Sequence, residues 1–99
     1  MNYECFKKRK VSCQDFDRII LGSITYFATQ LPNEYPINSC VIIEAFCKIF
    51  GRWRLLQLPV IVDNICKMGN DDKFEMPFYH VNFIADRSEC SKFKIILGL

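Results

Sequence analysis

The sequence lacks most of the features on which catalysis and cofactor binding depend. It has one histidine, His80, and its four glycines are scattered singly, so it contains no glycine-rich loop that could hold a phosphate. A lone histidine in strand-like sequence is typical of a structural residue, and no cysteine is marked out as its nucleophilic partner. We therefore expect no catalytic residue, no cofactor and no small-molecule substrate, and the chain is not predicted to be an enzyme.

The close pairs of cysteine or histidine that hold structural zinc, such as C-x2-C, are also missing. The closest spacings are Cys5 to Cys13 and Cys40 to Cys47. The second pair would lie about two turns apart on a helix, which is too far for one tetrahedral ion. The sequence therefore predicts no metal site.

Nothing in the sequence resembles a secretory signal or a membrane span. No apolar segment follows the early charges at residues 7–10, and no run approaches the roughly 18 apolar residues that cross a bilayer. The six cysteines could form disulfides, but Cys40, Cys47 and Cys66 lie in apolar periodic segments, where free cysteine packs as a small hydrophobe. We therefore expect free thiols, a reducing intracellular compartment and no membrane partner.

What the sequence does have is apolar residues, 51% of the total, enough to bury a core in one domain of 99 residues. Residues 1–11 are predicted to be a basic, flexible leader, because KKRK at 7–10 has no periodic pattern around it. Residues 12–99 are predicted to be the single domain. The chain ends at Leu99 in strand-like sequence, which indicates the amino-terminal domain of a longer protein.

Three segments have helical periodicity. Ser12 followed by Asp15 is a capping signature, and it predicts a helix over 13–30 that ends before the prolines of 31–36. Residues 40–50 are apolar on nearly every side and precede Gly51, so they predict a second helix. A third helix is predicted over 54–68, with Pro59 either breaking it or standing in its first turn.

The period changes to two at the carboxyl end. Apolar residues alternate with other residues over 79–85 and again over 93–97, which predicts two strands joined as a hairpin. Helix, extended piece, helix, turn, helix and hairpin is the order of a winged helix. We therefore predict an α+β fold of the winged-helix type, three helices followed by a C-terminal β-hairpin. The alternative is a helical bundle whose hairpin pairs between chains.

The turn predicted between the second and third helices contains Arg52, Trp53 and Arg54. One interpretation is that Trp53 fills the helix junction while both arginines are solvated. The other is that the three residues anchor a partner, because tryptophan and arginine dominate interface hot spots; they could equally stack on unpaired bases. Ile84 and Ile96 are expected to point outward from the hairpin and to extend an apolar surface for another protein chain, a second copy included.

A nucleic acid is the alternative partner, contacted through its phosphates. The residues that would make these contacts are Lys7, Lys8, Arg9, Lys10, Lys92 and Lys94, together with Arg52 and Arg54. Lysines on a hairpin also discourage edge pairing, and a net charge of +2 is too small to decide between these roles. The predicted third helix is mostly apolar with Asp63 in its middle, which does not suit reading a major groove.

Residues 46–65 resemble the LOTUS domain, a winged-helix module of animal germline RNA-granule proteins. Phe46 and Phe50-Gly51 match the family's aromatic-x-x-x-Phe-Gly end to the second helix, while Leu58-Pro59-Val60 lacks the glycine and aromatic residue of its Leu-Gly-aromatic turn. The resemblance implies binding to a DEAD-box RNA helicase, self-association or RNA binding. The expected function is a non-enzymatic protein–protein interaction or dimerisation module of a nuclear or RNA-granule protein.

Overall fold

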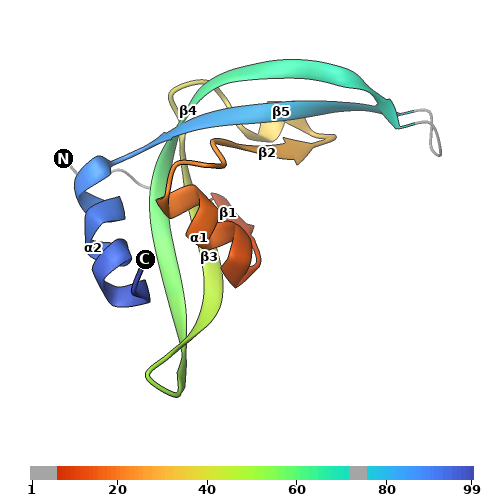
Figure 1. Ribbon diagram of the computed structural model, residues 1–99. Helices are drawn as coiled ribbons and strands as arrows, with labels where there is room; N and C mark the ends of the chain where they lie inside the picture. Colours follow the sequence, from red (N-terminus) through yellow and green to blue (C-terminus); the bar gives the residue numbers. More distant parts are fainter. Residues whose placement is uncertain (1–6, 72–75) are drawn as a thin grey trace.

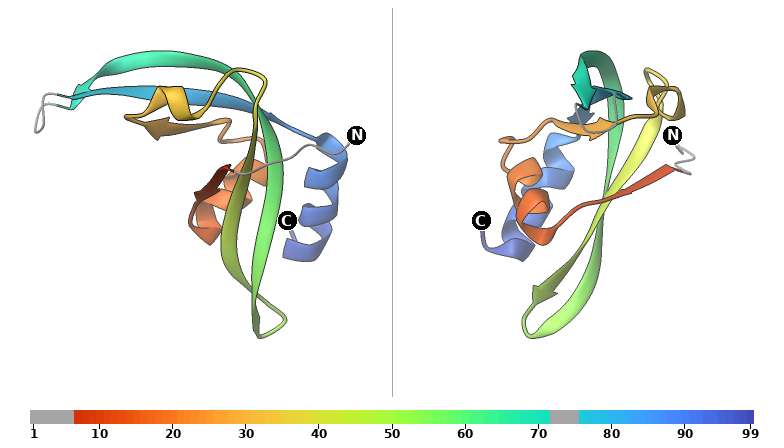
Figure 2. Two further views of the ribbon diagram at one scale, coloured as in Figure 1. Left: turned by 180° about the vertical axis from the view of Figure 1, so that it is seen from behind. Right: turned by 90° about the vertical axis from the view of Figure 1, so that its right-hand side faces the viewer.

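The computed structural model contains one mixed sheet with both helices on the same side of it (Figure 1, Figure 2). The structure describes residues 7–71 and 76–99. In chain order the elements are β1 (Lys7–Lys10), α1 (Cys13–Ile20), β2 (Tyr26–Thr29), the 3-10 turn η1 (Pro32–Glu34), β3 (Cys40–Ile49), β4 (Arg52–Asp71), β5 (Met76–Ala85) and α2 (Arg87–Leu97). The protein is therefore a small α+β domain, and the prediction of a winged helix with three helices and a C-terminal hairpin is wrong.

The sheet has the strand order β1-β3-β4-β5-β2, with β1 parallel to β3 and every other pair antiparallel. The first part of β4 pairs with β3 and the second part with β5, and the strand bends between them (Figure 1). The bend coincides with a register shift between Val62 and Asn64, which leaves Asp63 unpaired as a bulge. The sheet therefore has two arms: the first is β3 with the part of β4 that pairs with it, and the second is β5 with the remainder of β4. We call the side that carries α1 and α2 the inner face and the opposite side the outer face.

β3 and β4 replace the two helices predicted over 40–50 and 54–68. Every second residue of β3 is buried, and so are the β4 residues that face the first three of them: Val41, Ile43, Ala45, Cys47 and Ile49 on β3, and Leu56, Leu58 and Val60 on β4. Arg54 and Arg52, which face Cys47 and Ile49 near the turn, are exposed. The helical interpretation failed because outward residues such as Ile42 and Phe46 are apolar too, which hides the period of two. The β-branched residues of both segments favour the strand.

The hairpin between β3 and β4 closes through Phe50 and Gly51. Both residues have positive φ, 50° and 80°, as the two central residues of a type I′ turn require. Gly51 was predicted to stop a helix and instead completes a turn between strands. This turn extends past the ends of both helices, so the end of the hairpin is uncovered on both faces (Figure 1).

Pro59 occupies a central strand without breaking it. The first pair between β4 and β5 is Val60 with Ala85, so β5 has already ended beside Pro59. The nitrogen of Pro59 faces away from β3, because Val62 donates to the Ser39 carbonyl on that side and alternate residues of a strand point the same way. The missing N–H of the proline therefore costs no hydrogen bond of the sheet.

α1 begins where the sequence predicts and ends well before residue 30. The hydroxyl oxygen of Ser12 accepts a hydrogen bond from the Asp15 amide at 3.0 Å, which caps the helix. Phe16, with the isoleucines of the last turn, is buried against the sheet. Gly22 follows with φ of 81°, a conformation that ends the helix, and residues 26–29 form β2 instead of continuing it.

The predicted C-terminal hairpin exists only in its first half. Residues 79–85 lie in β5 as expected, but 93–97 belong to α2. Asp86 caps α2, since its Oδ1 accepts hydrogen bonds from the amides of Ser88 at 2.7 Å and Glu89 at 3.4 Å. An aspartate followed three residues later by a glutamate is a capping signal, which the apolar alternation of 93–97 obscured.

The two helices pack on each other and on the inner face of the sheet. The rings of Phe16 on α1 and Phe93 on α2 meet edge to face, with centroids 5.3 Å apart. Both helices are short, and neither combines the length and the apolar content that a bilayer span requires.

A disulfide between Cys13 and Cys47 attaches the start of α1 to β3, with the two Cα atoms 5.4 Å apart. Cys40 is also disulfide-bonded, whereas Cys66 and Cys90 are free. The prediction of free thiols throughout the chain is therefore wrong. It failed because it placed Cys47 on a helix, whereas the inner face of a strand brings this thiol to α1. The argument for a reducing compartment loses its support.

Candidate functional site

Exposed aromatic and aliphatic residues gather on the outer face near the β3–β4 turn. Trp53 is 69% exposed, Phe46 57% and Leu55 46%. Phe46 lies opposite Leu55 and Lys48 lies opposite Trp53, so these side chains are cross-strand neighbours on one face. We call Phe46, Trp53 and Leu55 the outer apolar patch. Trp53 is therefore a surface residue and fills no helix junction.

The alternation of β4 separates the residues predicted to bind a partner. Arg52 and Arg54 flank Trp53 in sequence but point to the opposite face, where both are exposed. Ile84, 59% exposed, lies on the outer face of β5, whereas Ile96, 45% exposed, lies on α2. The structure thus brings Trp53 and Ile84 to one face of the sheet and leaves Arg52, Arg54 and Ile96 away from it.

Two lysines border the outer apolar patch: Lys48 lies opposite Trp53, and Lys10 of the edge strand β1 lines a small hollow together with Phe46 and Leu55. Among the outward-facing residues of β3 and of the half of β4 that pairs with it, Lys48 is the only exposed charged one. Glu44 shares this face but is 5% exposed, and it accepts a hydrogen bond from Gln57 Nε2 at 2.9 Å. An aromatic patch with lysines only at its border has the composition of a protein interface, whose core is depleted of charge and whose rim is polar.

The basic residues predicted to contact nucleic acid lie on two separate elements. Lys7, Lys8, Arg9 and Lys10 form β1, and Lys92 and Lys94 lie on α2. Lys7 pairs with Glu34 at 3.6 Å and Lys92 pairs with Glu89 at 3.2 Å, in both cases between Nζ and a carboxylate oxygen. The predicted flexible leader is thus an ordered strand over 7–10, while residues 1–6 lie outside the described residues. Lysines on an edge strand discourage pairing with other chains.

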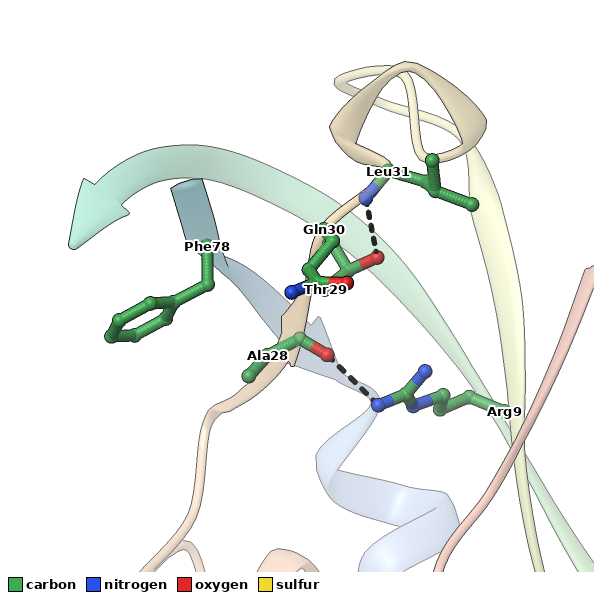
Figure 3. Close-up of a pocket in the computed structure, with 6 residues that line it drawn as sticks. All are labelled: Arg9, Ala28, Thr29, Gln30, Leu31 and Phe78. Carbon is green, nitrogen blue, oxygen red and sulfur yellow. Dashed lines mark hydrogen bonds between the residues drawn. The ribbon is translucent and has the colours of Figure 1, made fainter. Parts of the chain in front are cut away.

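A pocket of about 420 Å³ opens where the edge strands β1 and β2 approach each other (Figure 3). It is lined by Arg9, Ala28, Thr29, Gln30, Leu31 and Phe78. Figure 3 shows Arg9 reaching across to the Ala28 carbonyl, to which its guanidinium donates at 2.8 Å. The same guanidinium lies 5.2 Å from the centre of the Phe27 ring. Arg9 therefore covers the open edge of β2, and we assign this pocket a structural role.

The register of β4 and β5 brings together a polar group that the sequence did not predict. His80 lies directly opposite Cys66, whose thiol is exposed and free. Asn82 Nδ2 donates to Asn64 Oδ1 at 2.6 Å and to Cys66 Sγ at 3.8 Å. The ring of Tyr26 stacks on that of His80, with centroids 4.1 Å apart. We call Asn64, Cys66, His80 and Asn82 the polar cluster; it lies on the outer face of the second arm.

Sequence reasoning missed the polar cluster because it placed Cys66 on a helix, remote from the strand of His80. The register also depends on the bulge at Asp63, which cannot be predicted from the local sequence pattern. The other free thiol, Cys90, is buried, and this burial raises its pKa, so it stays protonated at neutral pH. Cys66 is thus the accessible thiol of the two.

No protein-family model matches the chain, and no curated protein matches it significantly. The residues that carry the resemblance to the LOTUS domain lie on β3, on the β3–β4 turn and on β4 rather than on helices. The winged-helix fold that this resemblance implied is therefore absent. The surfaces described above are the basis on which a function can be assigned.

Proposed function

We propose that this chain is a non-enzymatic protein–protein interaction module that associates with a second copy of itself through the outer apolar patch. The observation that carries the proposal is the exposure of Phe46, Trp53 and Leu55 side by side on one face. Soluble monomers rarely leave a contiguous aromatic surface in water, because burying each such side chain is worth about 1.5 to 3 kcal/mol. Tryptophan is also the residue type most typical of interface hot spots.

A second copy suits the charges of this face. Lys48 and Trp53 are cross-strand neighbours, so each copy presents one cation beside one indole. When two outer faces pair about a two-fold axis, Lys48 of each copy can lie over Trp53 of the other as a cation–π contact. Arg52 and Arg54 point to the opposite face and do not enter the interface. Lys10, on the edge strand β1 beside Phe46 and Leu55, can stay in solvent at the rim of such an interface.

The edges of the sheet offer a poorer route to association than its outer face. β1 presents three lysines along its edge, and Arg9 covers the Ala28 carbonyl at the edge of β2. Addition of a strand from another chain would require like charges to approach or Arg9 to be displaced. Face-to-face contact through the outer apolar patch requires neither.

A nucleic-acid function through KKRK, Lys92 and Lys94 has less support. These charges lie on β1 and α2, and Lys7, Arg9 and Lys92 already have partners within the chain. Because Trp53 is exposed, it could still bind a single-stranded nucleic acid by stacking on an unpaired base. Such binding would weaken steeply with salt, whereas an apolar interface responds little.

The proposal is tested by light scattering on the purified chain over a range of concentrations at low and high salt. A labelled single-stranded oligonucleotide is added in parallel samples. We expect a dimer that forms with rising concentration at both salt levels and does not bind the oligonucleotide. Because both copies of a two-fold dimer carry the substitution, Trp53→Ser should weaken this dimer roughly 1,000-fold, which corresponds to a hot-spot contribution of about 2 kcal/mol from each copy.

Leu31→Ser is the matched control, because Leu31 is 57% exposed, as Phe46 is, but lies outside the outer apolar patch. This variant should dimerise as the wild type does. The proposal fails if the chain is a monomer throughout, or if a folded Trp53→Ser variant dimerises unchanged. Oligonucleotide binding at low salt alone would favour the nucleic-acid alternative instead.

A further inference from the structure

We propose that Cys66 and His80 form one half of a zinc site, and that the same pair from a second copy of the chain completes it. The proposal does not depend on the outer apolar patch. Trp53 and Cys66 lie on different arms of the bent sheet, separated by roughly 40 Å along β4. The zinc site and the apolar interface can therefore be tested separately.

The positions of the two side chains suit one metal ion. Cys66 and His80 are directly opposite each other on adjacent antiparallel strands, which places their Cβ atoms about 5 Å apart on the same face. Zinc bonds of about 2.3 Å to sulfur and 2.0 Å to nitrogen bring the two ligand atoms to about 3.6 Å from each other. Side chains that start about 5 Å apart can reach this separation without moving the backbone.

Neither of the two residues is buried. Cys66 is exposed, and neither ring nitrogen of His80 takes part in a hydrogen bond within residues 7–71 and 76–99. The ring of His80 is held by stacking on Tyr26, which fixes its plane without occupying its nitrogens. The nitrogens of His80 therefore have no partner to leave. The Cys66 thiol donates a long hydrogen bond to Asn64 Oδ1 at 3.7 Å, which is given up when the thiol loses its proton on binding zinc.

The side-chain amide of Asn82 is placed to orient the sulfur of Cys66. Asn82 Nδ2 donates to Cys66 Sγ at 3.8 Å, and its orientation is fixed by a shorter hydrogen bond to Asn64 Oδ1 at 2.6 Å. An N–H directed at sulfur can remain as an outer hydrogen bond to the metal-bound sulfur and orient this ligand. Asn82 is thus a positioning residue for Cys66 and is not itself a ligand.

Two ligands do not complete a structural zinc site, which takes four. Within the described part of the chain, no three His, Cys, Asp or Glu side chains are placed to hold one ion together. A two-fold axis through the metal supplies the second cysteine and the second histidine and gives a Cys2His2 shell. Each of the two thiols loses its proton on binding, so their two negative charges balance the charge of the zinc ion.

The experiment uses the Trp53→Ser chain, in which the apolar interface is weakened, at a concentration where this chain is monomeric, with its disulfides intact and without oxygen. Zinc chloride is titrated while the molar mass is followed by sedimentation. We expect the mass to double, with the end point at one zinc ion per two chains, and to return to the monomer value when a chelator is added. Cobalt(II) in place of zinc should give the sulfur-to-cobalt charge-transfer band and the visible absorption of a tetrahedral site.

Variants identify the ligands. Cys66→Ser and His80→Phe should each abolish the doubling of mass, and the phenylalanine keeps a ring to stack on Tyr26 so that the strand stays packed. Cys90→Ser is the matched control, since it removes the other free thiol, and it should behave as the parent chain. Asn82→Ala should weaken zinc binding about tenfold while leaving the stoichiometry unchanged.

Three outcomes would overturn the zinc proposal: one metal ion per chain without a change of mass, a dimer that survives the chelator as a disulfide, or no metal-dependent change. None of them bears on the outer apolar patch. Conversely, a wild-type chain that stays monomeric in chelator but doubles its mass with zinc would remove the proposed apolar interface and keep the zinc site.

Discussion

Asp86 is the residue that sets the beginning of α2. Its Oδ1 accepts hydrogen bonds from the Ser88 hydroxyl at 2.6 Å and from the Ser88 amide at 2.7 Å. The hydroxyl contributes most to lowering the pKa of Asp86 below its ordinary value, followed by the amides of Ser88 and Glu89. Because the folded-state pKa is lowered, the stabilisation is complete above the ordinary carboxyl pKa of about 4 and is lost as the pH falls through the lower folded value.

We predict that Asp86→Asn lowers the melting temperature at neutral pH and that the difference from wild type disappears in acid. Asparagine still caps a helix, but its amide is neutral and so carries no negative charge that is lost when the pH falls. Thermal melts followed by circular dichroism, from neutral pH down to about pH 2, measure the difference. Ser88→Ala keeps the carboxylate but removes its strongest hydrogen bond, so it should reduce the pH dependence. A wild-type advantage that is equal at every pH would refute this role of the charge.

Single residues also set the edges of the sheet. Arg9 was predicted as one charge of a solvated basic run, and it instead links the two edge strands through the Ala28 carbonyl and the face of Phe27. Sequence could not reveal this role, because β1 and β2 meet only after the sheet has formed and bent. The cap at Ser12 was predicted correctly, because it depends on a residue only three positions away in the sequence.

At the scale of elements, the position of α1 depends on its attachment to β3. The helix has eight residues, too few to be stable on its own, and its buried face meets the sheet and α2. The Cys13–Cys47 disulfide joins positions 34 residues apart in sequence and holds the first turn of the helix against the inner face. Closing a loop of this length restricts the unfolded chain and thereby stabilises the fold.

We predict that Cys13→Ala combined with Cys47→Ala lowers the free energy of unfolding by about 3 to 4 kcal/mol. Denaturant titration followed by circular dichroism measures the change. Cys66→Ala removes an exposed free thiol and serves as the control, with a change close to zero. An unfolding free energy that is the same in the double variant and in wild type would show that the disulfide does not restrain the chain.

β3 and β4, which were predicted as helices, are the strands that carry the candidate interface. Alternation was visible over 79–85, where polar residues separate the apolar ones, and β5 was predicted there. It was hidden in β3 and β4, because Phe46, Leu55 and Ile42 are apolar although they face outward. Two of the side chains that obscured the period of two, Phe46 and Leu55, therefore belong to the interface that we propose. A local pattern that contradicts the fold is most often found where a surface has a function.

The candidate sites differ in how far the sequence reveals them. Trp53 could be singled out from its residue type and its arginine neighbours, and Ile84 from its place in an alternating strand. The separation of Arg52 and Arg54 from Trp53 requires the knowledge that this segment is a strand. The pairing of Cys66 with His80 requires in addition the register of β4 on β5 across the bulge at Asp63.

At the scale of the whole molecule, the bend of β4 divides the outer face into two surfaces. The first arm presents the outer apolar patch near the β3–β4 turn, and the second arm presents the polar cluster. The two helices cover the inner face, and β1 and β2 bound the sheet with lysines and Arg9 (Figure 2). The association that we propose is therefore directed to the outer face, with Trp53 at its centre in the first arm.

The fluorescence of Trp53 tests this interface most directly, because Trp53 is the only tryptophan of the chain and 69% of it is exposed. Emission and acrylamide quenching are measured from dilute to concentrated protein, at low and at high salt. If two copies pair through the outer apolar patch, the emission moves to shorter wavelength and quenching falls as the concentration rises, equally at both salt levels. Emission and quenching that stay those of an exposed indole at every concentration would contradict the interface, even if the chain were found to associate.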